Sequence, residues 1–314
     1  MYQVVIIGAG NIAAGFDSPQ SQDILTHAHV FSTYPGFFLR GFYDTDLEKA
    51  KEAARIWGGQ AYESMGQAME DTDIMICCVP DLYHGQVLRE TASYCPKLIV
   101  VEKPVAGSLE EAERIFALYQ HKIPIAVNYS RRYIKEIQEL KKDIKNYGRF
   151  LKGIGYYGKG LMHNGSHMLD LLNYFFGDIQ DVQAVPGSIY DYEKTDLSKD
   201  AVLKIQDSLF YMVAIDSRLV TIFEIELFFQ KFRIRILDGG AIIEKYKVEA
   251  SGPYEGYKKY VLWKKQNINS SRAMLGLAEN IKGFLDHGKE LECTIEDGIS
   301  VLKTCKRIEE KVRE

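Results

Sequence analysis

A glycine-rich segment near the start of the sequence could hold phosphate groups. Gly8-Ala9-Gly10-Asn11-Ile12-Ala13 directly follows the apolar run Val4-Val5-Ile6-Ile7, which is typical of a buried strand. A side chain at the first glycine would block a tight turn, one at the second would block a pyrophosphate, and the small Ala13 lets a helix approach the sheet. A plain strand-to-helix turn has the same local pattern. Because strands and helices alternate around it, we predict dinucleotide binding by Gly8, Gly10, Asn11 and Ile12.

An acidic residue ends the next strand candidate. Phe37 to Tyr43 is a second strand candidate, and Asp44 follows it. A carboxylate at this place accepts hydrogen bonds from both ribose hydroxyls and repels a 2′-phosphate, so NAD(H) is favoured over NADP(H). The alternative is that Asp44 caps the helix that begins near Leu47, and both roles are compatible.

The spacing between Gly8 and Asp44 is longer than the usual distance of about 20 residues. The segment Gly15-Phe16-Asp17-Ser18-Pro19-Gln20-Ser21-Gln22 resembles an insertion before a helical run, Ile24 to Tyr34. Two interpretations stay open. The insertion either covers the cofactor or moves the helix N-terminus away from the phosphates.

Two further residues could act on an alcohol and its proton. Lys103 follows the apolar run Leu98 to Val101, at the carboxyl end of a strand, where open α/β sheets bind ligands. His167 begins a helix whose positive end disfavours imidazolium and leaves the ring available as a base. Asp170, one turn later, could orient that ring. Oxidation of a secondary alcohol needs such a base, together with a cation beside the developing alkoxide.

The spacing of His163 and His167 also suits a metal ion. Gly165 between them weakens a helix at this place, and no nearby Glu-x-x-His or cysteine completes a ligand set. We therefore expect no metal.

The first 130 residues alternate between apolar runs and helical spacing. Ser108 and Glu111 form a capping box that opens a helix reaching about Gln120. Strands that are apolar on both faces argue for a doubly wound parallel sheet, so we expect an α/β Rossmann domain over residues 1–124. The other expected elements are strands at 74–79 and 123–128 and helices from Leu47 to Trp57 and from Leu82 to Tyr94.

The pattern changes after Asn128. A helix from Tyr133 to about Lys145 and a strand from Leu151 to Tyr157 come first, and a strand-rich stretch runs from Val182 to Lys264. Because no helices separate these strands, we expect an open, largely antiparallel sheet in an α+β domain over 125–314. The last forty residues return to helix, interrupted at Gly288 and near Glu296-Asp297-Gly298, and could pack back on the first domain. The named strands in this part are 209–215, 220–228, 232–237, 241–248 and 260–263.

Composition excludes several classes of protein. The chain has 314 residues, is 46% hydrophobic and carries a net charge of −4, so it lacks the dense basic face that nucleic acid needs. No run reaches the ~18 apolar residues of a membrane span. We see no signal peptide, and the five cysteines lack zinc spacing, with Cys77 and Cys78 typical of buried small hydrophobes. We expect a cytoplasmic protein.

Several ordered motifs resemble the Gfo/Idh/MocA family of NAD(P)-dependent oxidoreductases. They are Val79-Pro80-Asp81-x-x-His84, the strand followed by Glu102-Lys103-Pro104, the segment 128–133, Gly165-Ser166-His167-Met168-Leu169-Asp170 and 235–240, with the final helices around 296–298. Each motif is short, but the ordered set is specific and spans nearly the whole chain.

The resemblance implies roles for individual residues. Lys103 would touch both the nicotinamide ribose and the reacting hydroxyl, and His167 would exchange the proton. The family commonly places an aspartate four residues before that histidine, where this sequence has His163, followed by Asn164. We therefore expect Lys103, His167, His163 and Asn164 to be catalytic. The expected cofactor contacts also include Val79, Pro80, His84 and Glu102, and the expected substrate contacts are Lys103, Asn128, Arg132, Tyr157, His163 and His167.

The implied function is hydride transfer between NAD(H) and a CH–OH or ketone of a sugar, polyol or sugar nucleotide lying between the two domains. Two rivals remain: a non-catalytic NAD(P)-sensing regulator and an NAD-retaining lyase or glycosidase. The departure at His163 favours the regulator, and the presence of Lys103 and His167 argues against it. The resemblance also implies a homo-oligomer, a dimer or tetramer, formed through the outer face of the sheet.

Overall fold

The structure is a computed structural model that describes residues 1–120, 122–252 and 254–310. By contact, the chain divides into two compact units, residues 1–135 with 271–299 and residues 136–270 with 300–314. We describe each unit by itself. The functional division expected at residue 124 stays a prediction.

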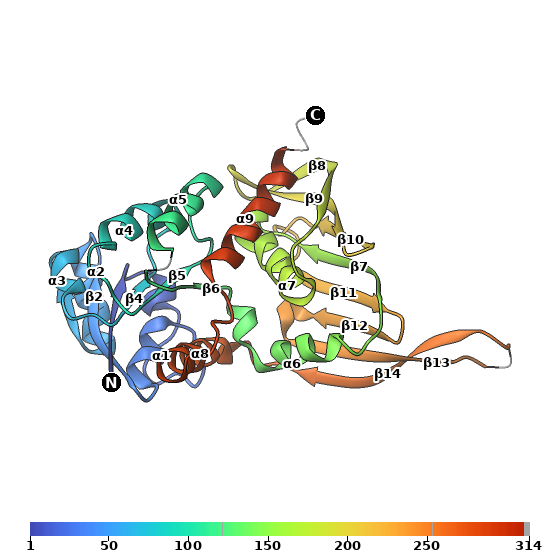
Figure 1. Cartoon of the computed structure of the whole chain (residues 1–314), viewed down its shortest axis with the longest axis horizontal. Coiled ribbons are helices and arrows are strands. Elements are labelled where there is room, and N and C mark those ends of the chain that lie inside the picture. Colours follow the sequence, from blue (N-terminus) through green and yellow to red (C-terminus); the bar gives the residue numbers. More distant parts are fainter. Residues whose placement is uncertain (121, 253, 311–314) are drawn as a thin grey trace. The chain divides into compact units, whose positions relative to one another are not determined.

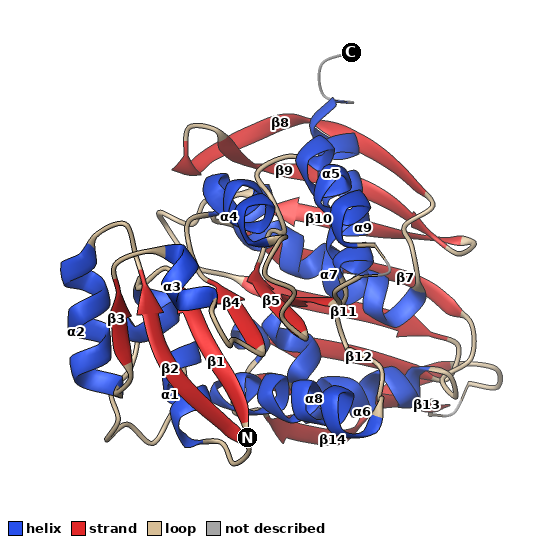
Figure 2. Ribbon diagram, turned by 60° about the vertical axis from the view of Figure 1, so that its left-hand side comes forward, coloured by secondary structure: helices blue, strands red, loops and turns tan. Residues whose placement is uncertain are grey.

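The first unit contains a parallel six-stranded sheet in the order β3-β2-β1-β4-β5-β6, with helices around it (Figures 1 and 2). Its central strands are buried on both faces, as the apolar runs predict. The strand order reverses between β1 and β4, and this reversal makes the point where open α/β sheets bind ligands. The doubly wound fold is thus confirmed. The strands are β1 Tyr2–Ile7, β2 Phe37–Tyr43, β3 Gln60–Tyr62, β4 Ile74–Cys77, β5 Leu98–Glu102 and β6 Ile125–Asn128.

Caps fix where the helices of this unit begin. Ser108 Oγ accepts from the Glu111 N–H at 3.2 Å and opens α5, as predicted. Asp46, not Asp44, caps α2 by accepting from the Glu48 N–H. The cap interpretation of Asp44 was therefore wrong, because the helix begins two residues too late for its side chain. The helices are α1 His27–Thr33, α2 Leu47–Trp57, α3 Met65–Met69, α4 His84–Thr91, α5 Leu109–Tyr119 and α8 Ala273–His287, with short turns η1 Asn11–Gly15, η2 Asp81–Tyr83, η3 Ser130–Tyr133 and η6 Ser270–Arg272.

The second unit contains an eight-stranded sheet in the order β14-β13-β12-β11-β7-β10-β9-β8. Only its β7–β10 pair is parallel, so the largely antiparallel sheet is confirmed. The β13–β14 hairpin projects beyond the other strands (Figure 1). The strands are β7 Phe150–Tyr157, β8 Asp181–Glu193, β9 Asp196–Ile205, β10 Ser208–Ala214, β11 Phe223–Phe229, β12 Phe232–Leu237, β13 Ile242–Ala250 and β14 Lys258–Asn267.

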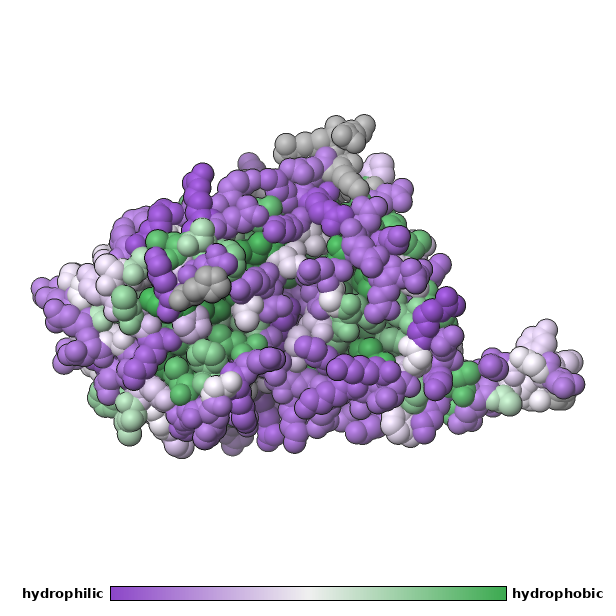
Figure 3. All heavy atoms as spheres, viewed as in Figure 1, coloured by the Kyte–Doolittle hydropathy of each residue, from purple (hydrophilic) through white to green (hydrophobic). Residues whose placement is uncertain are grey.

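Helices pack on this sheet through aromatic side chains. Phe176 of α7 contacts Phe150 and Phe229, with ring centroids 4.6 and 6.1 Å away. The outward side of α6 is hydrophilic (Figure 3), and Glu139 and Lys142 are exposed there. The helices and turns are α6 Lys135–Ile144, α7 Ser166–Phe176, η4 Leu161–Gly165, η5 Asp238–Gly240 and α9 Ile295–Glu310.

The C-terminal helices differ from expectation at one point. Helix α8 ends at Gly288, which takes the left-handed conformation (φ 63°) that suits glycine, as predicted. The turn expected at 296–298 was wrong, because these residues form the first turn of α9. No helix among the described residues is long and apolar enough to cross a membrane.

Candidate active site

The glycine loop has the shape that a dinucleotide requires. Gly8 has a φ of 92°, and a Cβ there would lie 2.7 Å from the Val79 backbone nitrogen. A Cβ on Gly10 would have no heavy atom within 4 Å. The first glycine is therefore demanded by the turn against β4. The second leaves open space where a pyrophosphate would approach, so these residues fit the cofactor.

The chain makes a helical turn immediately after the loop, in spite of the insertion. The π-helix η1 begins at Asn11, and the Ala14 N–H donates to the Gly10 carbonyl at 3.0 Å. Trp57 Nε1 donates to the Ala14 carbonyl at 2.9 Å and attaches this turn to α2. The insertion thus follows the turn at the glycine loop and precedes α1.

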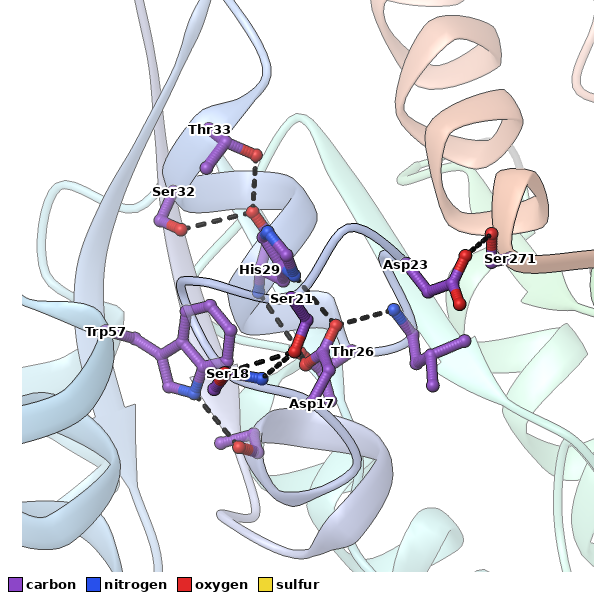
Figure 4. Close-up of polar contacts among 12 residues, drawn as sticks. Asp17, Ser18, Ser21, Asp23, Thr26, His29, Ser32, Thr33, Trp57 and Ser271 are labelled. Atoms are coloured by element: carbon purple, nitrogen blue, oxygen red, sulfur yellow. Dashed lines mark hydrogen bonds and ion pairs between the residues drawn. The ribbon is translucent and has the colours of Figure 1, made fainter.

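A network around Asp17 fastens the insertion to α1 (Figure 4). The carboxylate accepts from the Leu25 N–H at 2.7 Å, from Thr26 Oγ1 at 2.6 Å and from His29 Nδ1 at 2.8 Å. Burial by itself raises the pKa of Asp17, but these donors outweigh it, so the pKa lies below its ordinary value. Asp23 accepts from Ser271 Oγ at 2.7 Å, next to α8. These hydrogen bonds hold the insertion in a defined conformation within this unit.

Asp44 is held against the glycine loop. One carboxylate oxygen accepts from the Ala9 N–H at 2.7 Å and the other from the Asp46 N–H at 2.9 Å. This arrangement fixes a negative charge at the carboxyl end of β2. Its contact with a ribose stays a prediction.

A buried carboxylate lies next to Lys103. Glu102 Oε1 accepts from His27 Nε2 and from Asn128 Nδ2, each at 2.7 Å. Burial raises the pKa of Glu102, but the bonds from His27 and Asn128 and the charge of Lys103 outweigh it, so the pKa lies below its ordinary value. His27 Nδ1 and Asn128 Oδ1 are buried and have no hydrogen-bond partner among the described residues. The start of α1 and the ends of β5 and β6 thus bring these three side chains together. They fix a negative charge beside the half-buried Lys103.

His84 joins the loops after β4 and β5. Its Nδ1 lies 2.7 Å from the Pro104 carbonyl oxygen and its Nε2 lies 2.9 Å from that of Val79. Burial lowers the pKa of His84, although both carbonyls oppose the shift. The neutral ring donates to one carbonyl at a time, so His84 holds these loops and is itself closed to solvent.

In the second unit, His163 and His167 lie on one continuous helical segment. His163 and Asn164 lie in η4, and His167 is the second residue of α7, as expected for the start of a helix. Both histidines are half-buried. Asn164 Nδ2 donates to the Gly158 carbonyl at 2.9 Å. The Asp196 carboxylate accepts from the Met162 and His163 N–H groups, each at 2.8 Å, and stabilises the start of this segment.

Two predicted substrate contacts have structural partners. Arg132 is 3% exposed and binds the Asp297 carboxylate at 3.0 Å. The Tyr157 hydroxyl is buried. It donates to the Lys199 carbonyl at 2.7 Å and accepts from the Lys199 backbone N–H at 2.9 Å. Substrate contacts by these two residues stay predictions that the proposal below does not use.

Two further observations on the described residues concern cysteine nucleophiles and metal ligands. Cys77 and Cys78 are buried as expected, and burial raises the pKa of Cys77 to about 12, which makes it a poor nucleophile. Within the described ranges, no three His, Cys, Asp or Glu side chains gather as they would around a metal ion.

The match with known families covers the first unit's sheet. Residues 2–129 match the Gfo/Idh/MocA family model, described as an oxidoreductase family with an NAD-binding Rossmann fold. Through this domain the chain is similar to the Gfo/Idh/MocA family. The resemblance seen in the motifs is confirmed.

Individual relatives are more distant. The chain is 27% identical over 148 residues to a glucose-6-phosphate 3-dehydrogenase of Bacillus subtilis, a match that covers 46% of this chain and 39% of that protein. The matches span less than half the length of the curated relatives.

Solved structures share the fold of the whole chain at low identity. A UDP-N-acetylglucosamine 3-dehydrogenase from Acidithiobacillus ferrooxidans has a TM-score of 0.79 at 17% identity, over 99% of this chain and 97% of that one. A super-repressor mutant of Gal80p from Saccharomyces cerevisiae has a TM-score of 0.78 at 12% identity, over 99% and 96%.

Proposed function

We propose that this Gfo/Idh/MocA protein is an NAD(H)-dependent dehydrogenase or reductase that interconverts a secondary alcohol and a ketone on a phosphate-bearing hexose. Two relatives support the substrate class, because both are named as 3-dehydrogenases of hexoses that carry phosphate. The reacting position that we propose is accordingly the hydroxyl on carbon 3.

The observation that carries the proposal is the His27–Glu102–Asn128 network. A buried carboxylate costs free energy unless it is paired and hydrogen-bonded, and here both conditions are met. The network lies at the carboxyl ends of β5 and β6, one residue from Lys103. A fixed negative charge at that place favours the positive charge that an alkoxide-stabilising lysine needs.

The cofactor would be held by residues of the first unit. Gly8 and Gly10 leave room for the pyrophosphate, and Asp44 would accept from the adenosine ribose. The loops that His84 joins, with Val79, Pro80 and Glu102, would contact the nicotinamide end. When bound, the nicotinamide supplies the hydride chemistry, and the protein supplies position and charge.

In this proposal Lys103 and His167 handle the substrate oxygen and its proton. Lys103 donates a hydrogen bond to the substrate oxygen and stabilises its negative character. His167 accepts the hydroxyl proton during oxidation and returns it during reduction. His163 and Asn164, one turn earlier on the same segment, orient the substrate.

The decisive experiment follows NADH absorbance with glucose 6-phosphate, UDP-N-acetylglucosamine and their unphosphorylated counterparts. We expect NADH to form with a phosphate-bearing hexose and a 3-keto product to be recovered. Lys103→Ala should abolish turnover while NADH still binds. Lys97→Ala is the matched control and should be unaffected, because Lys97 lies at the opposite end of β5, where it pairs with Asp73 and lies over the Tyr2 ring. A normal rate in Lys103→Ala would refute the assignment of the active site.

A second candidate is an NAD(P)-sensing regulator without turnover. Two observations favour it: the fold is shared with Gal80p, and His163 replaces the usual aspartate. Tight NADH binding with no turnover of any hexose would support this candidate and overturn the first.

A further inference from the structure

An aromatic side chain from a neighbouring hairpin stacks on His163. Tyr192 lies at the end of β8, and its ring centroid is 4.4 Å from that of His163 with 30° between the planes. Tyr192 is 42% exposed, and its ring covers the imidazole. Nothing in the residue pattern of β8 predicts this contact.

Two buried aspartates fasten the hairpin end to the backbone that carries His163. Asp196, the first residue of β9, accepts from the His163 N–H at 2.8 Å. Asp191, one residue before Tyr192, accepts from the Lys159 N–H at 2.6 Å and from Ser198 Oγ at 2.8 Å. Tyr192 therefore lies in the chain between Asp191 and Asp196. These two aspartates bind backbone N–H groups just before η4 and within it.

The charged groups around this stack come from the same two segments. Lys159 Nζ lies 5.6 Å from the Tyr192 ring centroid, a favourable distance for a cation over an aromatic face. Asp191 and Asp196 face the backbone, and Glu193 acts on Asp196 through its charge. The imidazole of His163 thus contacts an aromatic ring with a cation nearby.

We propose that Tyr192 is a positioning residue for His163, holding the imidazole by ring stacking in the orientation in which it meets the substrate. This inference rests on the proposed function. Two aromatic rings in contact attract each other beyond the effect of the area that they bury. That attraction is enough to select one rotamer of a half-exposed ring, and rotamer precision at a reacting centre has a large effect on rate.

The test compares three variants with wild type. Tyr192→Leu removes the ring, Tyr192→Phe keeps it, and Tyr190→Leu changes the equally oriented, 59% exposed tyrosine two residues earlier on β8. We expect kcat/KM to fall roughly 3–30-fold in Tyr192→Leu, with most of the loss in kcat, and to stay within about twofold in the other two. Because Tyr192 is half-exposed, the leucine variant should fold.

A double-variant cycle separates positioning from a general structural effect. In a His163→Ala background, Tyr192→Leu should have no further effect, because the ring it positions is gone. Full additivity, or equal losses in Tyr192→Phe and Tyr192→Leu, would overturn the inference.

One measurement does not depend on turnover. The imidazole protons of His163 should show a ring-current shift in the NMR spectrum that is lost in Tyr192→Leu and kept in Tyr192→Phe. If no hexose is turned over but the shift behaves as expected, the proposed function fails and the stacking stands. If the shift is the same in all variants, the inference fails whatever the activity.

Discussion

His27 and His163 lie in opposite environments. His27 is fully buried, donates from Nε2 to an ionised carboxylate and follows directly on a loop fastened by Asp17. His163 is half-buried, lies on a short π-helix and stacks on a half-exposed tyrosine. The first is fixed by charge-assisted hydrogen bonds in the interior, and the second is held from outside by a hairpin.

The difference matches what each unit would bind. A cofactor is the same for every member of an enzyme class, so a rigid, buried network suits it. Substrates differ between members of an enzyme class. A surface segment that is held by a neighbouring hairpin can change its sequence without disturbing the hydrophobic core. We therefore expect substitutions in the Asp17 and Glu102 networks of the first unit to affect stability and cofactor affinity, and those around η4 to affect rate.

The largest effect in the second unit should come from His167→Ala. Loss of a general base lowers the rate by roughly 10²–10⁴-fold. Because His167 is half-buried near the start of α7, the free energy of unfolding should hardly change. Steady-state kinetics over a range of pH, together with thermal unfolding, check both parts. An unchanged pH–rate profile would refute the base role, and a large loss of stability would break the contrast between the units.

Asp17→Asn should show the opposite behaviour. Removing the charge weakens three hydrogen bonds of a buried group, and we expect a loss of about 2–4 kcal/mol in the free energy of unfolding together with weaker NADH binding. Asp23→Asn, which changes an exposed aspartate bonded to Ser271, is the control and should lose less.

The pH dependence of this effect has a definite sign. The pKa of Asp17 is lowered from 3.8 in the folded protein, so its contribution is complete above that value and is lost as the pH falls through the folded pKa. The difference in stability between wild type and Asp17→Asn, measured by urea unfolding, should therefore shrink as the solution is acidified below pH 4. A difference that grows under acid would contradict this account.

A smaller change is expected from Asp44→Asn. Neutralising the carboxylate removes repulsion of a 2′-phosphate, so the ratio of NADPH to NADH affinity should rise about tenfold, as for roughly 1.4 kcal/mol. Fluorescence titration with both cofactors measures the ratio. Asp46→Asn, which alters the cap of α2, is the control and should leave the ratio unchanged. Equal affinities in wild type would remove the argument for NAD.

Local patterns predicted the first unit well. Phe37–Tyr43 and Leu47–Trp57 end where expected, because an apolar run, helical spacing and Gly58 each leave a clear signal in neighbouring residues. β3 has three residues and α3 has five, which is too short for periodicity to show. β8 contains Pro186 and Gly187, which break the strand pattern, so the hairpin with β9 was not assigned.

The site was predicted where a motif lies in one stretch of chain. The glycine loop, Lys103 and His167 are of this kind. The contact of His27 with Glu102 could not be predicted, because the two residues are 75 positions apart and only the order of strands in the sheet brings them together. Tyr192 was missed for the same reason, since its contact with His163 depends on a hairpin. The sequence shows only that His27 could begin a helix and that Tyr192 could end a strand, and neither signal is specific for a site.

The smallest expected effect concerns the attachment of the turn that follows the glycine loop. Trp57→Phe keeps an aromatic ring 5.0 Å from His29 in place but removes the indole N–H that donates to Ala14. One lost hydrogen bond leaves a carbonyl unpaired, so we expect about 1 kcal/mol less stability and slightly weaker NADH binding. Trp263→Phe, at a half-exposed position on β14, should change neither. Because Trp57 belongs to the rigid unit, its variant should leave kcat on saturating cofactor unchanged. If kcat fell while stability held, η1 would act in the reaction itself, and the division between a rigid cofactor unit and a rate-determining second unit would need to be redrawn.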